Sequence, residues 1–172
     1  ARIVGKDFYA VFDSKEGGQM SEFSSFNALF NYQNTLTRRK EAYHAKFFAA
    51  QENNKSVDSA HEDGIDTIHD ISIEATEALK ENLFYDWYKK NSFIDHITDG
   101  SFCVDSLFRN DFREYGDFAN QPFVLSIEDG EAVFSREGGI YTDKKIDAKI
   151  TKRFSVFGEG IDFCIECLST EG

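Results

Sequence analysis

The chain has 172 residues, 41% of them hydrophobic, which suits one domain with a buried core and excludes an intrinsically disordered tail. Its 19 basic and 31 acidic residues give a net charge of −12, which opposes binding to nucleic acid and to anionic membrane surfaces and leaves neutral polymers as candidate ligands. No apolar run reaches the roughly 18 residues that a membrane-spanning helix needs. We therefore expect a single domain over residues 1–172.

The first predicted element is a β-hairpin. Apolar and other residues alternate over 8–13, a turn follows at 15–18, and the chain returns over 19–23. The composition agrees with a sheet protein, because 18 phenylalanines against seven tyrosines and one tryptophan supply bulky apolar side chains for the inside of a sandwich.

The middle of the chain is predicted to be a long connection. The apolar spacing over 35–50 favours a helix, the polar residues 51–63 indicate a mobile surface loop, and 71–80 is again compatible with a helix. Residues 92–97 then become extended and apolar. The connection therefore carries one or two helices between strands.

The last third of the chain predicts antiparallel strands. The only proline, Pro122, forces an extended conformation on the residue before it, and a strand is expected from Phe123 to residue 127. A turn at Asp129-Gly130 leads to a return strand over 132–135. The alternation over 146–156 is the clearest in the sequence and is interrupted only by Lys152. A turn at 157–160 leads to a final strand over 161–167.

The cysteines and glycines receive structural interpretations. Cys103, Cys164 and Cys167 are an odd count in a chain whose start lacks a signal-peptide layout, so reduced thiols and a cytoplasmic location are expected. Cys164 and Cys167 have the spacing of metal and redox sites, but residues three apart on a strand point to opposite faces. The glycine pairs at 17–18 and 138–139 are interpreted as hairpin glycines, since no phosphate-binding helix follows them. No metal and no cofactor are expected.

Several short strings stand out along the chain, at residues 16–23, 34–44, 68–70, 85–88, 92–96, 113–123 and 135–141. In this order they resemble the C-terminal region of glycoside hydrolase family 57, in its 4-α-glucanotransferases and α-amylases. Each string alone is weak, but their common order is specific, and together they span nearly the whole chain.

The resemblance implies a mainly β fold, a two-sheet antiparallel sandwich of the galactose mutarotase-like supersandwich type. It implies that both catalytic carboxylates lie in an N-terminal (β/α) barrel, and no segment here is similar to that barrel, so no catalytic residue is expected. The chain is interpreted as an accessory domain that supports the barrel and contacts α-glucan, and as a fragment of a larger region. Exposed sheet edges of such a fragment favour self-association, so we expect a homo-oligomer.

Three aromatic residues are candidate carbohydrate contacts. Trp87, flanked by Tyr85 and Tyr88, has a face that suits the apolar C–H surface of glucose, and Tyr115 lies in the family string over 113–123. The alternative for Trp87 is a core or interdomain contact, which is the commoner use of tryptophan.

The histidines support a rival hypothesis. His69 and His96 each stand beside an aspartate, an arrangement that can fix a tautomer for acid–base or metal chemistry. Adjacent residues on a strand point in opposite directions, so a role in anchoring loops is favoured. The rival is a free-standing mutarotase-like sugar epimerase, in which His69 or His96 would face a glutamate in one concave pocket.

Overall fold

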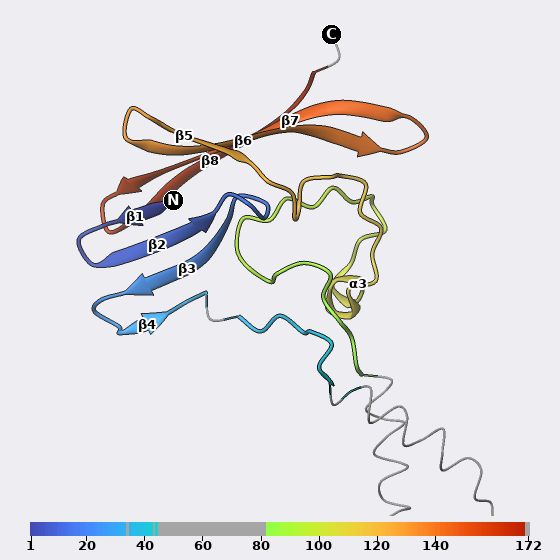
Figure 1. Ribbon diagram of the computed structural model, residues 1–172, viewed down its shortest axis with the longest axis horizontal. Coiled ribbons are helices and arrows are strands. Elements are labelled where there is room, and N and C mark those ends of the chain that lie inside the picture. Colours follow the sequence, from blue (N-terminus) through green and yellow to red (C-terminus); the bar gives the residue numbers. More distant parts are fainter. Residues whose placement is uncertain (34, 43, 45–81, 171–172) are drawn as a thin grey trace, which may run out of the picture. The chain divides into compact units, whose positions relative to one another are not determined.

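The computed structural model describes residues 1–33, 35–42, 44 and 82–170 (Figure 1). Contacts divide the chain into two compact units, one of Ala1–Thr37 with Trp87–Gly172 and one of Arg38–Asp86. The first unit contains two four-stranded antiparallel sheets and one short helix. In the second, Arg38 and Asp86 form an ion pair of 2.6 Å, and the Asp86 amide donates to the Arg38 carbonyl. No helix in the described ranges is long and apolar enough to span a bilayer.

The elements follow one another along the chain with simple up-and-down pairing. Their bounds are β1 Arg2–Val4, β2 Phe8–Asp13, β3 Gln19–Ser25, β4 Phe30–Asn31, α3 Val104–Arg109, β5 Val124–Glu128, β6 Glu131–Tyr141, β7 Lys145–Phe157 and β8 Gly160–Ser169. The first sheet has the order β1-β2-β3-β4 and the second the order β5-β6-β7-β8. Each strand therefore pairs with its neighbour in sequence.

The two sheets meet through an aromatic core. Phe12 of β2 packs against Phe134 of β6, with ring centroids 5.7 Å apart, and against Phe154 of β7 at 4.4 Å. The core cluster consists of Ala10, Phe12, Met20, Phe118, Phe123, Ala132, Phe134, Ala148, Ile150 and Phe154. Alternate residues of β2 and β7 are buried, which confirms that the alternation predicted the inward face of both strands.

The predicted hairpins are present with the expected turn residues. Asp129 and Gly130 have φ of 49° and 86°, so both turn residues take the positive φ that tight antiparallel hairpins need. Leu125 pairs with Phe134 across this hairpin, and β7 pairs with β8 along its length. The mainly β fold of two antiparallel sheets is thus confirmed.

Some predictions of local structure were wrong, and others fall outside the described residues. Gly138 and Gly139 lie inside β6 and not in a hairpin turn. Residues 35–41 are irregular, so the predicted helix does not begin at Thr35. The rest of that helix, apart from residues 42 and 44, the expected loop at 51–63 and the helix at 71–80 lie outside the described residues. Helix α3, capped by Cys103 and by Asn110 with φ of 57°, was not predicted.

Candidate functional site

Lys152 is the polar centre of the core. It lies on the inward face of β7 between Ile150 and Phe154 and has no exposed surface. Its Nζ donates to the carbonyl oxygens of Gly17 and Phe93, each at 2.6 Å, and forms an ion pair with Asp95. Three oxygen acceptors around one Nζ require the three donors of an ammonium group.

The buried pair is shifted by the loss of water. Burial lowers the pKa of Lys152, and the Asp95 carboxylate opposes that shift. Burial also raises the pKa of Asp95, against the effect of the Lys152 ammonium. The pair joins the β2–β3 turn, the segment around residue 93 and the middle of β7, so its role is to hold these three segments together.

The neighbouring His96 serves a different partner. His96 Nδ1 lies 2.6 Å from Glu114 Oε2, and the other carboxylate oxygen of Glu114 accepts the amides of Ile97 at 2.8 Å and Gly116 at 3.0 Å. Asp95 instead contacts Lys152. The Asp95-His96 sequence is therefore not a dyad, and His96 anchors a loop, as the opposite directions of adjacent side chains indicated.

Trp87 and Tyr88 stand beside His96 in an aromatic cluster. The His96 ring lies 5.6 Å from Trp87, 4.4 Å from Tyr88 and 5.2 Å from Phe112, in edge-to-face contacts. Tyr88 is buried, whereas Trp87 keeps 42% of its surface exposed. Of the two predicted contacts, only Trp87 presents a substantial ring surface to solvent.

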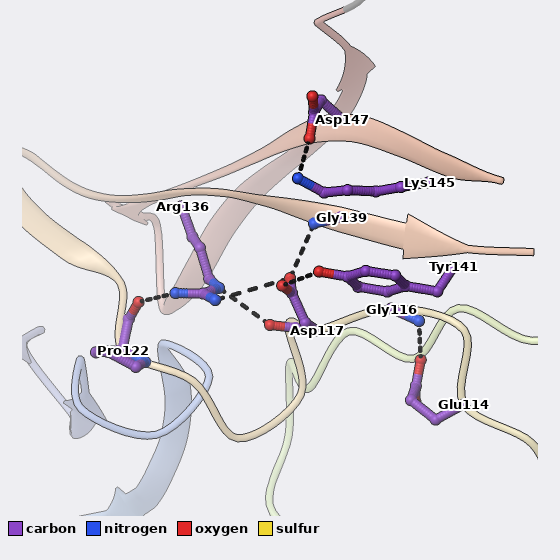
Figure 2. A network of polar contacts seen from close by, with 9 residues as sticks. All are labelled: Glu114, Gly116, Asp117, Pro122, Arg136, Gly139, Tyr141, Lys145 and Asp147. Carbon is purple, nitrogen blue, oxygen red and sulfur yellow. Dashed lines mark hydrogen bonds and ion pairs between the residues drawn. The ribbon is translucent and has the colours of Figure 1, made fainter.

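Asp117 organises the turn that precedes β5 (Figure 2). Its Oδ1 accepts the amide of Gly139 at 3.0 Å, and its Oδ2 accepts the Tyr141 hydroxyl at 3.4 Å. Arg136 donates from Nε to the Asp117 carbonyl at 3.0 Å and from its terminal nitrogen to the Pro122 carbonyl at 3.3 Å. The turn is therefore fastened along the edge of β6.

The glycines of this region are required by close approach. A Cβ on Gly138 would lie 2.2 Å from Asp117 Oδ1 and 2.9 Å from the buried Phe118 ring, and one on Gly116 would lie 2.7 Å from Ile97. Gly116 pairs with Ile140 in an isolated bridge. This position of β6 therefore holds a glycine because the adjoining segment leaves no room for a side chain.

Tyr115 lies at a separate place, in a small cavity. Its hydroxyl donates to Asp99 Oδ2 at 2.9 Å, and the Arg113 guanidinium lies 4.6 Å from its ring centroid. The cavity has a volume of about 270 Å³, and an adjoining one of about 200 Å³ shares Thr98, Asp99 and Arg113 with it. A third, of about 470 Å³, is lined by Asp117, Glu137, Gly138, Lys145, Asp147, Ala148 and Thr170.

The second sheet leaves part of its inward face uncovered. Phe163 of β8 pairs with the fully buried Phe154, yet it is 55% exposed. Ile127 of β5 pairs with the buried Ala132, yet it is 69% exposed. Leu125 and Ile165 lie on the same face and are also exposed. We call these four residues, Leu125, Ile127, Phe163 and Ile165, the uncovered inward face.

The histidines and cysteines show no assembled catalytic or metal site within the described ranges. His69 lies outside them, and neither His96 nor Glu114 lines any of the three cavities above. Cys103, Cys164 and Cys167 are free and exposed. No group of three metal-binding side chains occurs among the described residues.

Four of the strings that resemble the family, residues 16–23, 92–96, 113–123 and 135–141, contact one another in the fold. Residues 16–23 bond to 113–123 through Gly17 N and Gln121 O at 2.7 Å, and to 92–96 through Met20 N and Ser92 O at 2.9 Å. Residues 113–123 in turn bond to 135–141 through Asp117 and Gly139. The strings therefore build one side of the core.

A chain with this two-sheet fold belongs to an established family of C-terminal enzyme domains, as a match over nearly its whole length shows. The family described as "Alpha-amylase/4-alpha-glucanotransferase, C-terminal" matches residues 1–171, and the chain is a member of it.

The individual relatives are glucan-processing enzymes by name. The chain is 31% identical over 158 residues to the 4-α-glucanotransferase of Thermococcus litoralis. This match covers 92% of the present chain and 23% of the Thermococcus protein. It is 32% identical over 146 residues to an α-amylase of Pyrococcus furiosus, covering 84% and 21%. The crystal structure of the Thermococcus litoralis enzyme shares the fold with a TM-score of 0.74 at 24% identity, over 98% of this chain and 22% of that one. The chain thus spans about a quarter or less of the length of these relatives.

Proposed function

We propose that this chain is the accessory β-sandwich domain of a family 57 α-glucan-processing enzyme, a 4-α-glucanotransferase or an α-amylase, and that it supports the catalytic part of that enzyme. Membership of a C-terminal domain family and the names of its relatives support the class. The chain itself supplies no catalytic residue in this proposal. A cytoplasmic location accompanies it, supported by three free thiols.

The observation that carries the proposal is the uncovered inward face. Inward residues of a sandwich are normally covered by the opposite layer, but here Ile127 and Phe163 are more than half exposed at the two edges of the sheet. Exposed apolar side chains on the inward face at each edge of the sheet offer two places for a further segment to pack against the sandwich. Since the chain spans only about a quarter of its relatives, the occupant we assign is the rest of the parent polypeptide.

The proposal includes contact with α-glucan through the predicted aromatic residues. Trp87 offers an exposed ring face, and Tyr115 lines a cavity, whereas the buried Tyr88 acts by supporting Trp87 from the side. In the isolated chain we expect a second copy to cover the uncovered inward face, which gives a homo-oligomer.

The gene provides the first test. The proposal requires the reading frame to encode a glucan-processing catalytic domain ahead of this chain. In that full-length enzyme, Ile127→Asp is expected to lower transglycosylation or hydrolysis of maltooligosaccharides, because it places a charge in an apolar contact. Val124→Asp is the matched control, since Val124 is 72% exposed on the opposite face of the same strand.

Two results would contradict the proposal. One is a reading frame without a catalytic domain, and the other is equal activity and thermal stability of the Ile127→Asp and Val124→Asp enzymes. The rival epimerase is tested on the chain alone by polarimetry, in which we expect no acceleration of glucose anomer interconversion. His96 and Glu114 bind each other and line none of the three cavities described above, which favours the accessory function over the epimerase.

A further inference from the structure

We propose that the two adjoining cavities around Asp99 and Arg113 form a binding groove for two consecutive glucosyl units of an α-glucan. This inference rests on the proposed function and gives its carbohydrate contact a defined place. The groove is built from three segments of the first unit, residues 97–106, 111–115 and 140–143.

The size of the groove fits short carbohydrate. The two cavities have volumes of about 200 and 270 Å³. Each is smaller than the roughly 300–1,000 Å³ typical of sites for drug-sized ligands, so each suits a single ring. Their shared wall of Thr98, Asp99 and Arg113 makes them neighbours, as consecutive units of a chain require.

The groove offers partners for both the apolar C–H faces and the hydroxyl groups of a glucose ring. One cavity is lined by Tyr115 with Ile97 and Ile140, and the other is lined by Phe102 and Phe112. Such apolar surfaces suit the C–H faces of glucose. Polar groups around them suit its hydroxyls, and each cavity has an aromatic side chain and several polar ones.

Several polar groups of the groove are free to bind a ligand. Arg113 is exposed, and within the described chain its guanidinium contacts only the Tyr115 ring, which leaves its five N–H donors available. The carboxylates of Asp111 and Asp143 likewise have no hydrogen bond or ion pair among the described residues. A carboxylate and a guanidinium can each bind two neighbouring hydroxyls at once.

Asp99 is held in place for such a role. It accepts bonds from the Ser101 hydroxyl at 2.5 Å, the Ser101 amide at 2.8 Å and the Tyr115 hydroxyl at 2.9 Å. These bonds lower the pKa of Asp99, that from the Ser101 hydroxyl most, and the bond to Asp99 raises the pKa of Tyr115. Asp99 therefore stays ionised, and the Tyr115 ring is fixed at the cavity wall.

The charge of the groove selects against other ligand classes. Three aspartates against one arginine oppose phosphorylated or other anionic ligands. No cluster of three metal-binding side chains exists among the described residues, so a divalent cation is a poor match. A neutral polyhydroxyl compound fits both conditions.

The larger cavity beside Asp117 is a weaker candidate. Three of its four charged groups are already engaged, because Lys145 pairs with Asp147 at 2.5 Å and Asp117 is bound to Gly139 and Tyr141 (Figure 2). No aromatic side chain lines it. The groove around Asp99 and Arg113 combines several free polar groups with aromatic side chains. The cavity beside Asp117 has no aromatic side chain, and of its charged groups only Glu137 has no hydrogen bond or ion pair among the described residues.

The groove is tested by titrating the isotopically labelled 172-residue chain with maltotriose and following its amide NMR signals. We expect saturable shifts at Thr98, Asp99, Arg113, Tyr115 and Thr142 at millimolar sugar. Arg113→Ala is expected to weaken binding about tenfold or more, the effect of losing a hydrogen bond to a charged group. Arg153→Ala is the matched control, since Arg153 lies on β7, pairs with Glu128 and lines neither cavity.

Three other results would contradict the proposed binding groove. Saturable shifts confined to Trp87 and its neighbours would place the sugar elsewhere and leave the proposed function standing. Shifts in the groove with calcium chloride and none with maltotriose would identify a cation site, and no saturable shift with either would leave the groove without a ligand. If Arg113→Ala disturbs the whole spectrum, Asp143→Asn replaces it, with a weaker affinity again expected. The gene and the Ile127→Asp enzyme test the proposed function independently.

Discussion

The centre and the edges of the second sheet follow the same alternation but differ in burial. On β7, Ile150, Lys152 and Phe154 are almost completely buried under the first sheet and the segments around residues 93 and 118. On the flanking strands, the paired Phe163 and Ile127 remain exposed. A strand pattern therefore determines which way a side chain faces, while its burial depends on what covers that face.

The largest effect is expected at the centre. Lys152→Met keeps a similar volume but leaves Asp95 buried without its cation and the carbonyls of Gly17 and Phe93 without a donor. Breaking a buried pair in this way costs about 3–5 kcal/mol. We expect that loss in the free energy of unfolding, measured by denaturant titration at pH 7.

The carboxylate supplies the control for this prediction. Burial raises the pKa of Asp95 above its unfolded value, so its contribution to stability is fully present below the ordinary value of about 3.9 and is lost as the pH rises through the folded value. The Lys152→Met chain should therefore lose less unfolding free energy relative to wild type as the pH is lowered.

A double variant tests the same explanation. Adding Asp95→Asn to Lys152→Met should recover part of the lost unfolding free energy at pH 7. A double variant no more stable than Lys152→Met would contradict the buried-charge explanation.

A smaller effect is expected where the Asp117 turn meets β6. Gly138→Ala would bring a Cβ to 2.2 Å from Asp117 Oδ1, so the turn must shift. Overpacking of this kind costs about 1–3 kcal/mol, and we expect a value near 2 by thermal or chemical unfolding. Gly160→Ala is the control, because no atom lies within 4 Å of its added Cβ. Equal stability of the two variants would show that the turn yields freely.

The smallest effect on stability is expected at the edges. Ile127→Thr removes an exposed apolar side chain and should change the free energy of unfolding by no more than about 0.5 kcal/mol. Combined with Ile165→Thr, it should nevertheless reduce self-association of the isolated chain, as measured by sedimentation velocity over a range of concentrations. A wild-type chain that sediments as a monomer at every concentration would contradict this prediction.

Local pattern was sufficient to predict the long hairpins of the fold. Alternation and the Asp129-Gly130 turn predicted β5, β7, β8 and the first part of β6, because each of these strands pairs with its neighbour in sequence. β1 and β4 were missed because strands of three and two residues show no alternation. Helix α3 was missed because its six residues make fewer than two helical turns, too few to show a helical period. A glycine is needed at position 138 because Asp117 and Phe118 lie against it, and the sequence around the glycine does not reveal this contact.

The candidate sites were likewise predictable only where a local pattern in the sequence marked them. Lys152 left a signal, since it was the one interruption of the clearest alternation, but its partners Gly17, Phe93 and Asp95 are distant in sequence. Tyr115 was singled out by its family string, while the contributions of Asp99 and Arg113 required the folded chain. The exposure of Trp87 could not be predicted, because tryptophan is more often a buried residue.

The bond between Lys152 and Gly17 also bears on the order of folding. It joins residues 135 positions apart, so the first hairpin cannot gain this contact until most of the chain has been synthesised. Closing so long a loop has an entropic cost that is recovered only when the final contacts form, and folds rich in distant contacts form slowly. The first sheet therefore emerges from the ribosome well before β7, and its core remains incomplete until β7 packs against it.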